Sequence, residues 1–401
     1  MTVSGCLLGA CQSGPPTPVP GVPVNCDAYG GVRTGSWRRV SYPEGVATDT
    51  AAVDAAAFSL IGGNHCALCQ VNELAIGQES WTTSSFDEYE FGTVPSSAAA
   101  SANFVAFSDL AVAERTIDQY ARLLLWERGT NLWREFDPPL DYGSRIEISL
   151  WWTGQEFLLW GGYRVDVPFF EDNTAIANLA DGALFDPLTE TWRMAAAARP
   201  PVEFLYGDGD ARYQLSDVWT PEGLLVWGTN ADETAPFLAV YSPDDDVWTE
   251  LEATNSPPLR VRHELVYGDG NVYLFSGDEP ELGRGQGTGQ PFWDLWRLDL
   301  DTLEWQEIAV PVFVDLYHPQ AGVPPSPSAA WVNGKLLISG SVCTGVAIYD
   351  PDSDSWTRST TDGGPPAGGT AYALGGELYL NAVRYSPSTP TDTVWIFDPE
   401  G

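Results

Sequence analysis

The segment Ala183–Trp192, ALFDPLTETW, joins an apolar run to an Asp-Pro turn and ends on a tryptophan six residues after the aspartate. The pattern returns as LAVYSPDDDVW (238–248), LWRLDLDTLEW (295–305) and VAIYDPDSDSW (346–356), with weaker copies LLLWERGTNLW (123–133) and VNELAIGQESW (71–81). The copies end on Trp81, Trp133, Trp192, Trp248, Trp305 and Trp356, at intervals of 52, 59, 56, 57 and 51 residues. This near-constant spacing is typical of a repeat architecture.

Each copy has the same two apolar runs upstream of it. The nearer run ends in small residues, as in FSLIGG (58–63), FLLWGG (157–162), LLVWGT (224–229), VYLFSG (272–277) and LLISG (336–340). The earlier run is joined to it by a turn such as Thr153-Gly154, Gly268–Asn271 or Asn333-Gly334, and these turns favour β-hairpins. Each unit therefore reads as four short strands, and units of about 50 residues built this way predict the blades of a β-propeller.

The two ends of the chain carry complementary parts of one further blade. Gly35–Tyr42, GSWRRVSY, reads as a fourth strand with Trp37 in the repeat position, but no first three strands precede it. Thr370–Asp398 supplies three strands, and no tryptophan follows them before Gly401. Joining these segments leaves no open sheet edge. The sequence thus predicts an all-β, seven-bladed propeller over residues 32–401, closed by an N-terminal strand in the C-terminal blade.

The units resemble the Kelch repeat, which is marked by an apolar run closed by Gly-Gly, an aromatic residue on the third strand and a tryptophan on the fourth. Gly-Gly stands at Gly62-Gly63 and Gly161-Gly162, and pairs such as Ser339-Gly340 replace it elsewhere. The resemblance covers Val32–Gly401 and implies a Kelch-type propeller like that of galactose oxidase. The several histidines and the cross-linked tyrosine of that enzyme's copper site cannot be placed in this sequence.

The charge of the chain narrows its possible partners. There are 55 acidic against 19 basic residues, giving a net charge of −36, and Lys335 is the single lysine. Such a surface repels nucleic acid and anionic lipid, so we expect neither as a direct partner. Turn carboxylates such as Asp244–Asp246, Asp352 and Asp354 have three interpretations: solvation of a secreted protein, calcium in the loops, or adaptation to salt. We expect no other cofactor.

The first residues resemble an export signal. Leu8–Cys11, LGAC, looks like a bacterial lipobox, in which Cys11 would be acylated, so residues 1–11 are interpreted as a lipoprotein signal and 12–31 as a proline-rich tether. The expected location is the bacterial cell envelope through a lipid anchor, or the extracellular space. The stretch lacks the basic residues and the long apolar core of such signals, so export by another route is the alternative.

The other cysteines predict disulfides in an exported protein. Cys26, Cys66, Cys69 and Cys343 allow three pairings, of which we prefer Cys66 with Cys69 and Cys26 with Cys343. The alternative is a metal or redox site at His65, Cys66 and Cys69. We assign no metal site, because three histidines in the whole chain are too few for a His-rich zinc or copper site.

Candidate binding residues lie in the connections between strands. The longest insertions are Tyr163–Leu179 and Asp278–Phe292, and loops of this length on a rigid scaffold commonly bind ligands. Three arginines, Arg145, Arg212 and Arg260, each stand sixteen residues before the small residue that closes the second strand. The Kelch resemblance also places an arginine here and matches His263. The three guanidiniums predict an arc that binds carboxylates of a peptide or an acidic sugar. The alternative is that each pairs with a carboxylate of the neighbouring blade.

Three functions remain open on these observations. The leading hypothesis is a non-catalytic, monomeric, exported or surface-anchored propeller that binds a protein or glycan through its loops. The alternative is a carbohydrate-active enzyme of the sugar epimerase, mutarotase or lyase type, with its site at the channel mouth and no catalytic residue yet assigned. A structural surface protein without a discrete ligand is the third.

Overall fold

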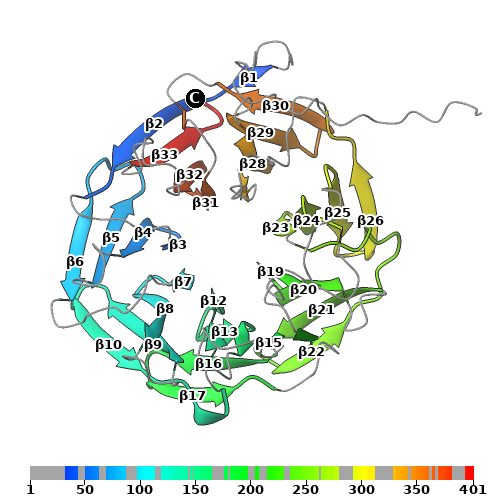
Figure 1. Cartoon of the computed structure of the whole chain (residues 1–401). Helices are drawn as coiled ribbons and strands as arrows, with labels where there is room; N and C mark the ends of the chain where they lie inside the picture. Colours follow the sequence, from blue (N-terminus) through cyan, green and yellow to red (C-terminus); the bar gives the residue numbers. More distant parts are fainter. Residues whose placement is uncertain are drawn as a thin grey trace, which may run out of the picture.

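Seven antiparallel sheets stand around a central axis in the computed structural model (Figure 1). The structure describes residues 32–43, 50–62, 69–86, 97–112, 119–142, 145–146, 148–164, 176–178, 181–196, 204–206, 215–229, 235–261, 263–279, 292–311, 328–341, 345–360, 364–365, 369–381 and 393–401. The predicted all-β, seven-bladed propeller is confirmed. No helix among these residues is both long and apolar enough to cross a membrane.

Each blade is a four-stranded meander with its first strand nearest the axis. Blades 1 and 2 are β3 (Thr50–Val53), β4 (Ala57–Gly62), β5 (Cys69–Ala75) and β6 (Thr82–Phe86), then β7 (Ser97–Ala100), β8 (Phe104–Val112), β9 (Gln119–Glu127) and β10 (Leu132–Phe136). Blades 3 and 4 are β12 (Ser149–Trp152), β13 (Phe157–Trp160), β16 (Gly182–Asp186) and β17 (Thr191–Met194), then β19 (Leu215–Thr220), β20 (Gly223–Thr229), β21 (Pro236–Ser242) and β22 (Val247–Glu250).

The remaining three blades follow the same plan. Blade 5 is β23 (Glu264–Gly268), β24 (Asn271–Phe275), β25 (Leu295–Asp299) and β26 (Glu304–Ile308). Blade 6 is β27 (Ser328–Val332), β28 (Lys335–Ser341), β29 (Gly345–Asp350) and β30 (Ser355–Ser359). Blade 7 is β31 (Thr370–Leu374), β32 (Glu377–Asn381), β33 (Thr393–Asp398) and, from the start of the chain, β2 (Ser36–Ser41).

The ring closes where the sequence predicts. β2 pairs antiparallel with β33 and sets Trp37 opposite Phe397. The structure adds a strand that the sequence did not predict, β1 (Arg33–Thr34), which pairs parallel to β30 of blade 6. Gly35 joins the two strands at φ +74°, and a Cβ there would lie 2.4 Å from the Phe397 ring. The N-terminal segment therefore holds blade 6 with one strand and blade 7 with the next, and only glycine fits between them.

The repeated tryptophans join neighbouring blades, beyond the packing between strands expected from the sequence. Four indole N–H groups donate to the blade before their own: Trp37 to Thr360 O (2.7 Å), Trp81 to Ser41 O (2.7 Å), Trp133 to Ser84 Oγ (3.3 Å) and Trp356 to Ala309 O (3.0 Å). The apolar clusters also span two blades each, as where Trp160 and Leu184 of blade 3 meet Leu224 and Tyr241 of blade 4. The core thus lies between the blades, and the tryptophan spacing reflects it.

In blades 3, 5 and 6 the aspartate of the repeat shapes the turn before the tryptophan. Asp299 Oδ1 accepts hydrogen bonds from the N–H groups of Asp301 (3.0 Å) and Thr302 (2.8 Å), and Asp186 and Asp350 do the same in their turns. The N–H of Thr302 holds the pKa of Asp299 below its ordinary value. Five turns then place a left-handed residue two positions before the tryptophan: Asn131, Glu190, Asp246, Leu303 and Asp354.

Candidate functional site

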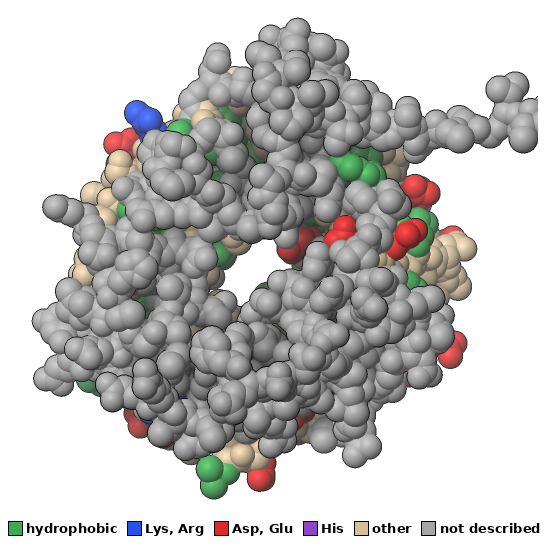
Figure 2. Space-filling model, in the orientation of Figure 1, with side chains coloured by type: hydrophobic (Ala, Val, Ile, Leu, Met, Phe, Trp, Pro, Cys, Tyr) green, Lys and Arg blue, Asp and Glu red, His purple; other side chains and the backbone are tan. Residues whose placement is uncertain are grey.

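The wall around the axis is made of seven inner strands that are almost free of charge. Their sequences are TAAV, SAAA, SLWW, LSDVWT, ELVYG, SAAWV and TAYAL. Asp217 on β19 and Glu264 on β23 are the only acidic or basic residues in these seven strands, and they lie on neighbouring blades. Figure 2 shows the ring open at its centre, with acidic side chains beside the opening on the side of β23. In a chain so acidic overall, this restriction marks the two carboxyls as candidates for function.

Serine hydroxyls connect the inner strands of adjacent blades. Ser97 Oγ accepts from the Leu150 N–H (2.9 Å), and Ser328 Oγ accepts from the Ala371 N–H (3.0 Å). Ser216 Oγ donates to the carbonyl of His263 (2.6 Å), which fixes β19 against the start of β23. Asp217 and Glu264 therefore stand on strands whose relative position is set by a direct hydrogen bond.

Asp217 lies in the seam between blades 3 and 4. It accepts hydrogen bonds from the Ser149 hydroxyl (2.9 Å) and from Trp151 Nε1 (2.5 Å). Burial raises the pKa of Asp217 despite these two donors. Trp151 in turn stacks on Trp219, with ring centroids 6.3 Å apart. The carboxyl is thus held in one orientation beside a pair of partly exposed indoles.

Glu264 opens β23 and has no hydrogen-bond partner for its carboxyl among the described residues. A small part of its surface stays accessible, while protein surrounds the carboxyl on nearly every side. Burial, and next the charge of Asp217, raise the pKa of Glu264 to about 7. A carboxyl that titrates near neutral pH in a channel wall can take up or release a proton, as general acid–base chemistry requires.

The raised pKa of Glu264 predicts a pH dependence of stability. The unfolded carboxyl ionises near pH 4.5 and the folded one near 7, so the contribution of Glu264 to folding stability is fully present below about pH 4.5 and is lost as the pH rises to about 7. Glu264→Gln is expected to remove this loss, on the order of 3 kcal/mol at pH 8, and to leave stability at pH 4 unchanged. Thermal unfolding of both proteins across this range measures it, and parallel curves at every pH would contradict it.

Arg260, one of the three predicted arginines, is fully buried and bound by protein groups. Its guanidinium pairs with both carboxylate oxygens of Asp294 (2.5 and 2.8 Å) and donates to the carbonyls of Ser276 (3.1 Å) and Pro258 (3.2 Å). It also lies 4.0 Å from the centre of the Phe292 ring. From the sequence, the alternative to ligand binding was an ion pair with a carboxylate of the neighbouring blade. The structure shows an ion pair, but its carboxylate, Asp294, belongs to the same blade as Arg260. A ligand role for Arg260 stays a prediction.

His263 is buried against Trp227. Its Nε2 lies 3.2 Å from the Trp227 carbonyl, and its ring meets the indole edge to face at 4.7 Å. Burial, with the charge of Arg260, lowers the pKa of His263 to about 3, so the imidazole is neutral near physiological pH. These contacts hold the start of blade 5 against blade 4, and binding of a ligand by His263 stays a prediction.

The insertion after Trp160 contributes to an accessory sheet and is not only a loop. Its strands β14 (Tyr163–Arg164) and β15 (Ile176–Asn178) pair with β11 (Arg145–Ile146) and β18 (Phe204–Tyr206) in the order β11-β14-β15-β18. Arg145 stands opposite Arg164 in backbone register. The side chain of Arg145 and the whole of Arg212 lie outside the described residues, so the predicted arginine arc remains untested.

Other predicted sites fall mostly outside the described residues. Cys69 begins β5, but its side chain and residues Cys11, Cys26, Cys66 and Cys343 are not described, so lipidation and disulfides stay predictions. No group of three or more His, Cys, Asp or Glu in the described ranges could hold a metal ion. Asp217 and Glu264 were missed from the sequence. Their signal was a lone carboxylate in an otherwise neutral inner strand.

No family model matches the chain. Alpha-scruin and beta-scruin of Limulus polyphemus are 25% and 26% identical to it over 200 and 201 residues, which are 46% of this chain and 21% of each scruin. Adagio-like protein 3 of Oryza sativa subsp. japonica is 25% identical over 217 residues, 49% of this chain and 32% of that protein. The alignments thus span about a fifth to a third of the length of these relatives. Together, the similarity to the scruins and the seven-bladed ring support a Kelch-type propeller.

Proposed function

We propose that this Kelch-type propeller binds a partner protein through the face that carries the accessory sheet. The observation that carries the proposal is the assembly of that sheet from three separate connections: before β12, between β13 and β16, and before β19. The ring is complete without these strands. Structure added to the connections of a rigid scaffold is a common form of binding surface. The relatives, which align over about half of this chain, support a Kelch-type propeller as the scaffold of this surface.

The position of the sheet supports recognition of one partner face. In a meander the connections before the first strand and after the second lie at the same end of the blade, so all three segments project from one end of blade 3. Backbone pairing fixes them relative to one another, which lowers the entropy lost when a partner binds.

The test is replacement of residues 163–178 by a short Asn-Gly turn that joins β13 to β16. In the control variant, the hairpin turn Thr153–Gln155, at the other end of the same blade, is replaced by a different turn sequence. We expect both variants to unfold at the temperature of the parent and only the first to lose a partner identified by cross-linking, by about tenfold or more in Kd. Equal retention of the partner by both variants would refute the proposal. If the parent binds a glycan and the first variant does not, the partner of this face is a carbohydrate and not a protein.

The pair Asp217 and Glu264 favours a carbohydrate-active enzyme as the second candidate function. Two carboxyls with raised pKa values beside partly exposed indoles suit proton transfer on a sugar stacked against an aromatic ring. Incubation with neutral sugars and uronic acids, followed by NMR, tests it. Turnover lost in Glu264→Gln supports the enzyme, and no turnover by the parent on the whole panel rejects it.

A further inference from the structure

The end of the ring opposite the accessory sheet is formed by hairpin turns. In blades 1 to 6 the turn between the first and second strands and the turn between the third and fourth strands lie at the same end, because successive strands are antiparallel. Blade 7 adds the turn between β31 and β32. We call this end the hairpin face. All the turns that form the hairpin face lie within the described residues.

Four consecutive blades expose a large apolar side chain on the outer hairpin of this face. The residues, with their exposed fractions, are Ile76 (41%), Leu132 (48%), Leu188 (79%) and Val247 (50%), from blades 1, 2, 3 and 4. The described residues hold only two other large apolar side chains this exposed, Val32 and Leu140. The same hairpins of blades 5 and 6 expose Asp301 and Ser353 instead. The four apolar residues thus lie on one side of the ring, one on each of four neighbouring blades, and we call this set the apolar arc.

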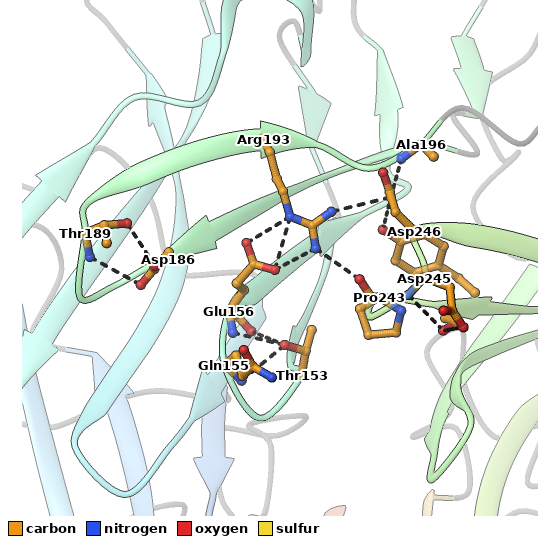
Figure 3. A network of polar contacts seen from close by, with 12 residues as sticks. Thr153, Gln155, Glu156, Asp186, Thr189, Arg193, Ala196, Pro243, Asp245 and Asp246 are labelled. Atoms are coloured by element: carbon orange, nitrogen blue, oxygen red, sulfur yellow. Dashed lines mark hydrogen bonds and ion pairs between the residues drawn. The ribbon is translucent and has the colours of Figure 1, made fainter.

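Ion pairs link blades 1 to 4 near this face. Arg128 of blade 2 reaches Asp54 (2.5 Å) and Glu73 (2.6 Å) of blade 1, and Arg134 of blade 2 reaches Glu190 of blade 3. Figure 3 shows the next link, in which Arg193 of blade 3 binds Glu156 of its own blade (2.6 Å) and Asp246 (3.5 Å) and the Pro243 carbonyl (3.2 Å) of blade 4. The apolar arc therefore has a fixed shape before any partner arrives.

The same ion pairs leave the arc acidic. Its arginines, Arg128, Arg134 and Arg193, are all bound to carboxylates of the protein. Exposed carboxylates lie in the same hairpin turns as the apolar residues, Glu79 in the turn of Ile76 and Asp244 and Asp245 in the turn before Val247. A segment that covers the arc must place apolar groups on the four side chains and positive charge on the surrounding carboxylates.

We propose that the hairpin face of blades 1 to 4 docks a basic amphipathic segment of a partner protein. The surface is distinct from the accessory sheet at the other end of the ring, so it is a second interaction site and does not depend on the function proposed above. Its apolar arc provides the buried contact area. The unneutralised carboxylates select against acidic partners.

The experiment uses a basic helical probe peptide and its acidic counterpart. The first peptide has one leucine face and one lysine face over about five turns, and the second carries glutamate in place of lysine. Fluorescence anisotropy measures binding to the parent, to Leu132→Ser with Leu188→Ser, and to the control Leu140→Ser. Leu140 is 95% exposed but lies in the connection from β10 to β12, at the other end of the ring.

The double variant is expected to weaken binding of the lysine peptide by about tenfold or more, and the control to bind like the parent, with thermal unfolding unchanged in both. The glutamate peptide is expected not to bind. Equal binding of the lysine peptide by the parent and the double variant would show simple attraction to an acidic protein and would overturn the proposal. Equal binding of the two peptides would overturn it as well.

Discussion

Removing residues 1–41 is expected to abolish cooperative unfolding of the ring, whereas removing residues 1–31 leaves it intact. The strand pairings that tie the N-terminal segment into the ring come from residues 33–41, through β1 on β30 and β2 on β33. The longer deletion removes Val40, which is 4% exposed in the ring, from the core, and it also removes the packing of Trp37 on Phe397, with centroids 4.8 Å apart. Burial of these two side chains is worth about 5 kcal/mol, a large part of the stability of an ordinary domain.

Denaturant unfolding and size-exclusion chromatography measure this effect. The longer deletion also leaves the outer edge of β33 unpaired, so we expect it to aggregate. The shorter deletion is the matched control, because it keeps both pairing strands. A single cooperative transition with the parent's midpoint in the longer deletion would contradict closure by the N-terminal segment.

Arg260→Ala is expected to cost about 3–5 kcal/mol in stability, the largest effect that we predict for a single substitution. The guanidinium is wholly buried, and its loss leaves the Asp294 carboxylate in the protein without its bidentate partner. Asp294 also accepts from Trp296 Nε1 (2.7 Å), which only partly compensates. The substitution further removes the cation from the face of Phe292.

The double variant Arg260→Leu with Asp294→Leu separates a structural role from ligand binding. If the pair is structural, replacing both partners recovers much of the lost stability, because no buried charge is left alone. Urea denaturation of the single and double variants gives the coupling energy. A stable Arg260→Ala protein that has lost a ligand would instead support the predicted anion-binding arc.

The sequence predicted the ring because its signal is repeated and local. The tryptophan spacing gave the number of blades, and the Gly35–Tyr42 segment gave the closure, since each rests on a periodic apolar pattern. β1 was not predicted because a strand of two residues carries no period. The accessory sheet was missed for the same reason, since its strands are two or three residues long and come from three distant connections.

The candidate site was predictable only in part. The register of Arg260 was visible, but its partner Asp294 lies 34 residues away among 55 acidic residues, and no local pattern distinguishes it from the others. Glu264 gains its raised pKa from burial and from Asp217 on the neighbouring blade, which are properties of the closed ring. Which residues form an ion pair, and how deeply they are buried, depend on how the folded chain packs. A repeat pattern in the sequence does not show this packing.

The adjoining strands β1 and β2 give the ring a defined response to mechanical load. A pull applied at residue 32 reaches the short parallel pair of β1 with β30 before it reaches the six-residue pairing of β2 with β33. We expect the shorter pairing to yield first, because it joins two residues and the other joins six, and Gly35 is the residue between the two strands. Tension on the N-terminal segment is thus absorbed at the rim, and the channel wall keeps its shape while the protein is under strain.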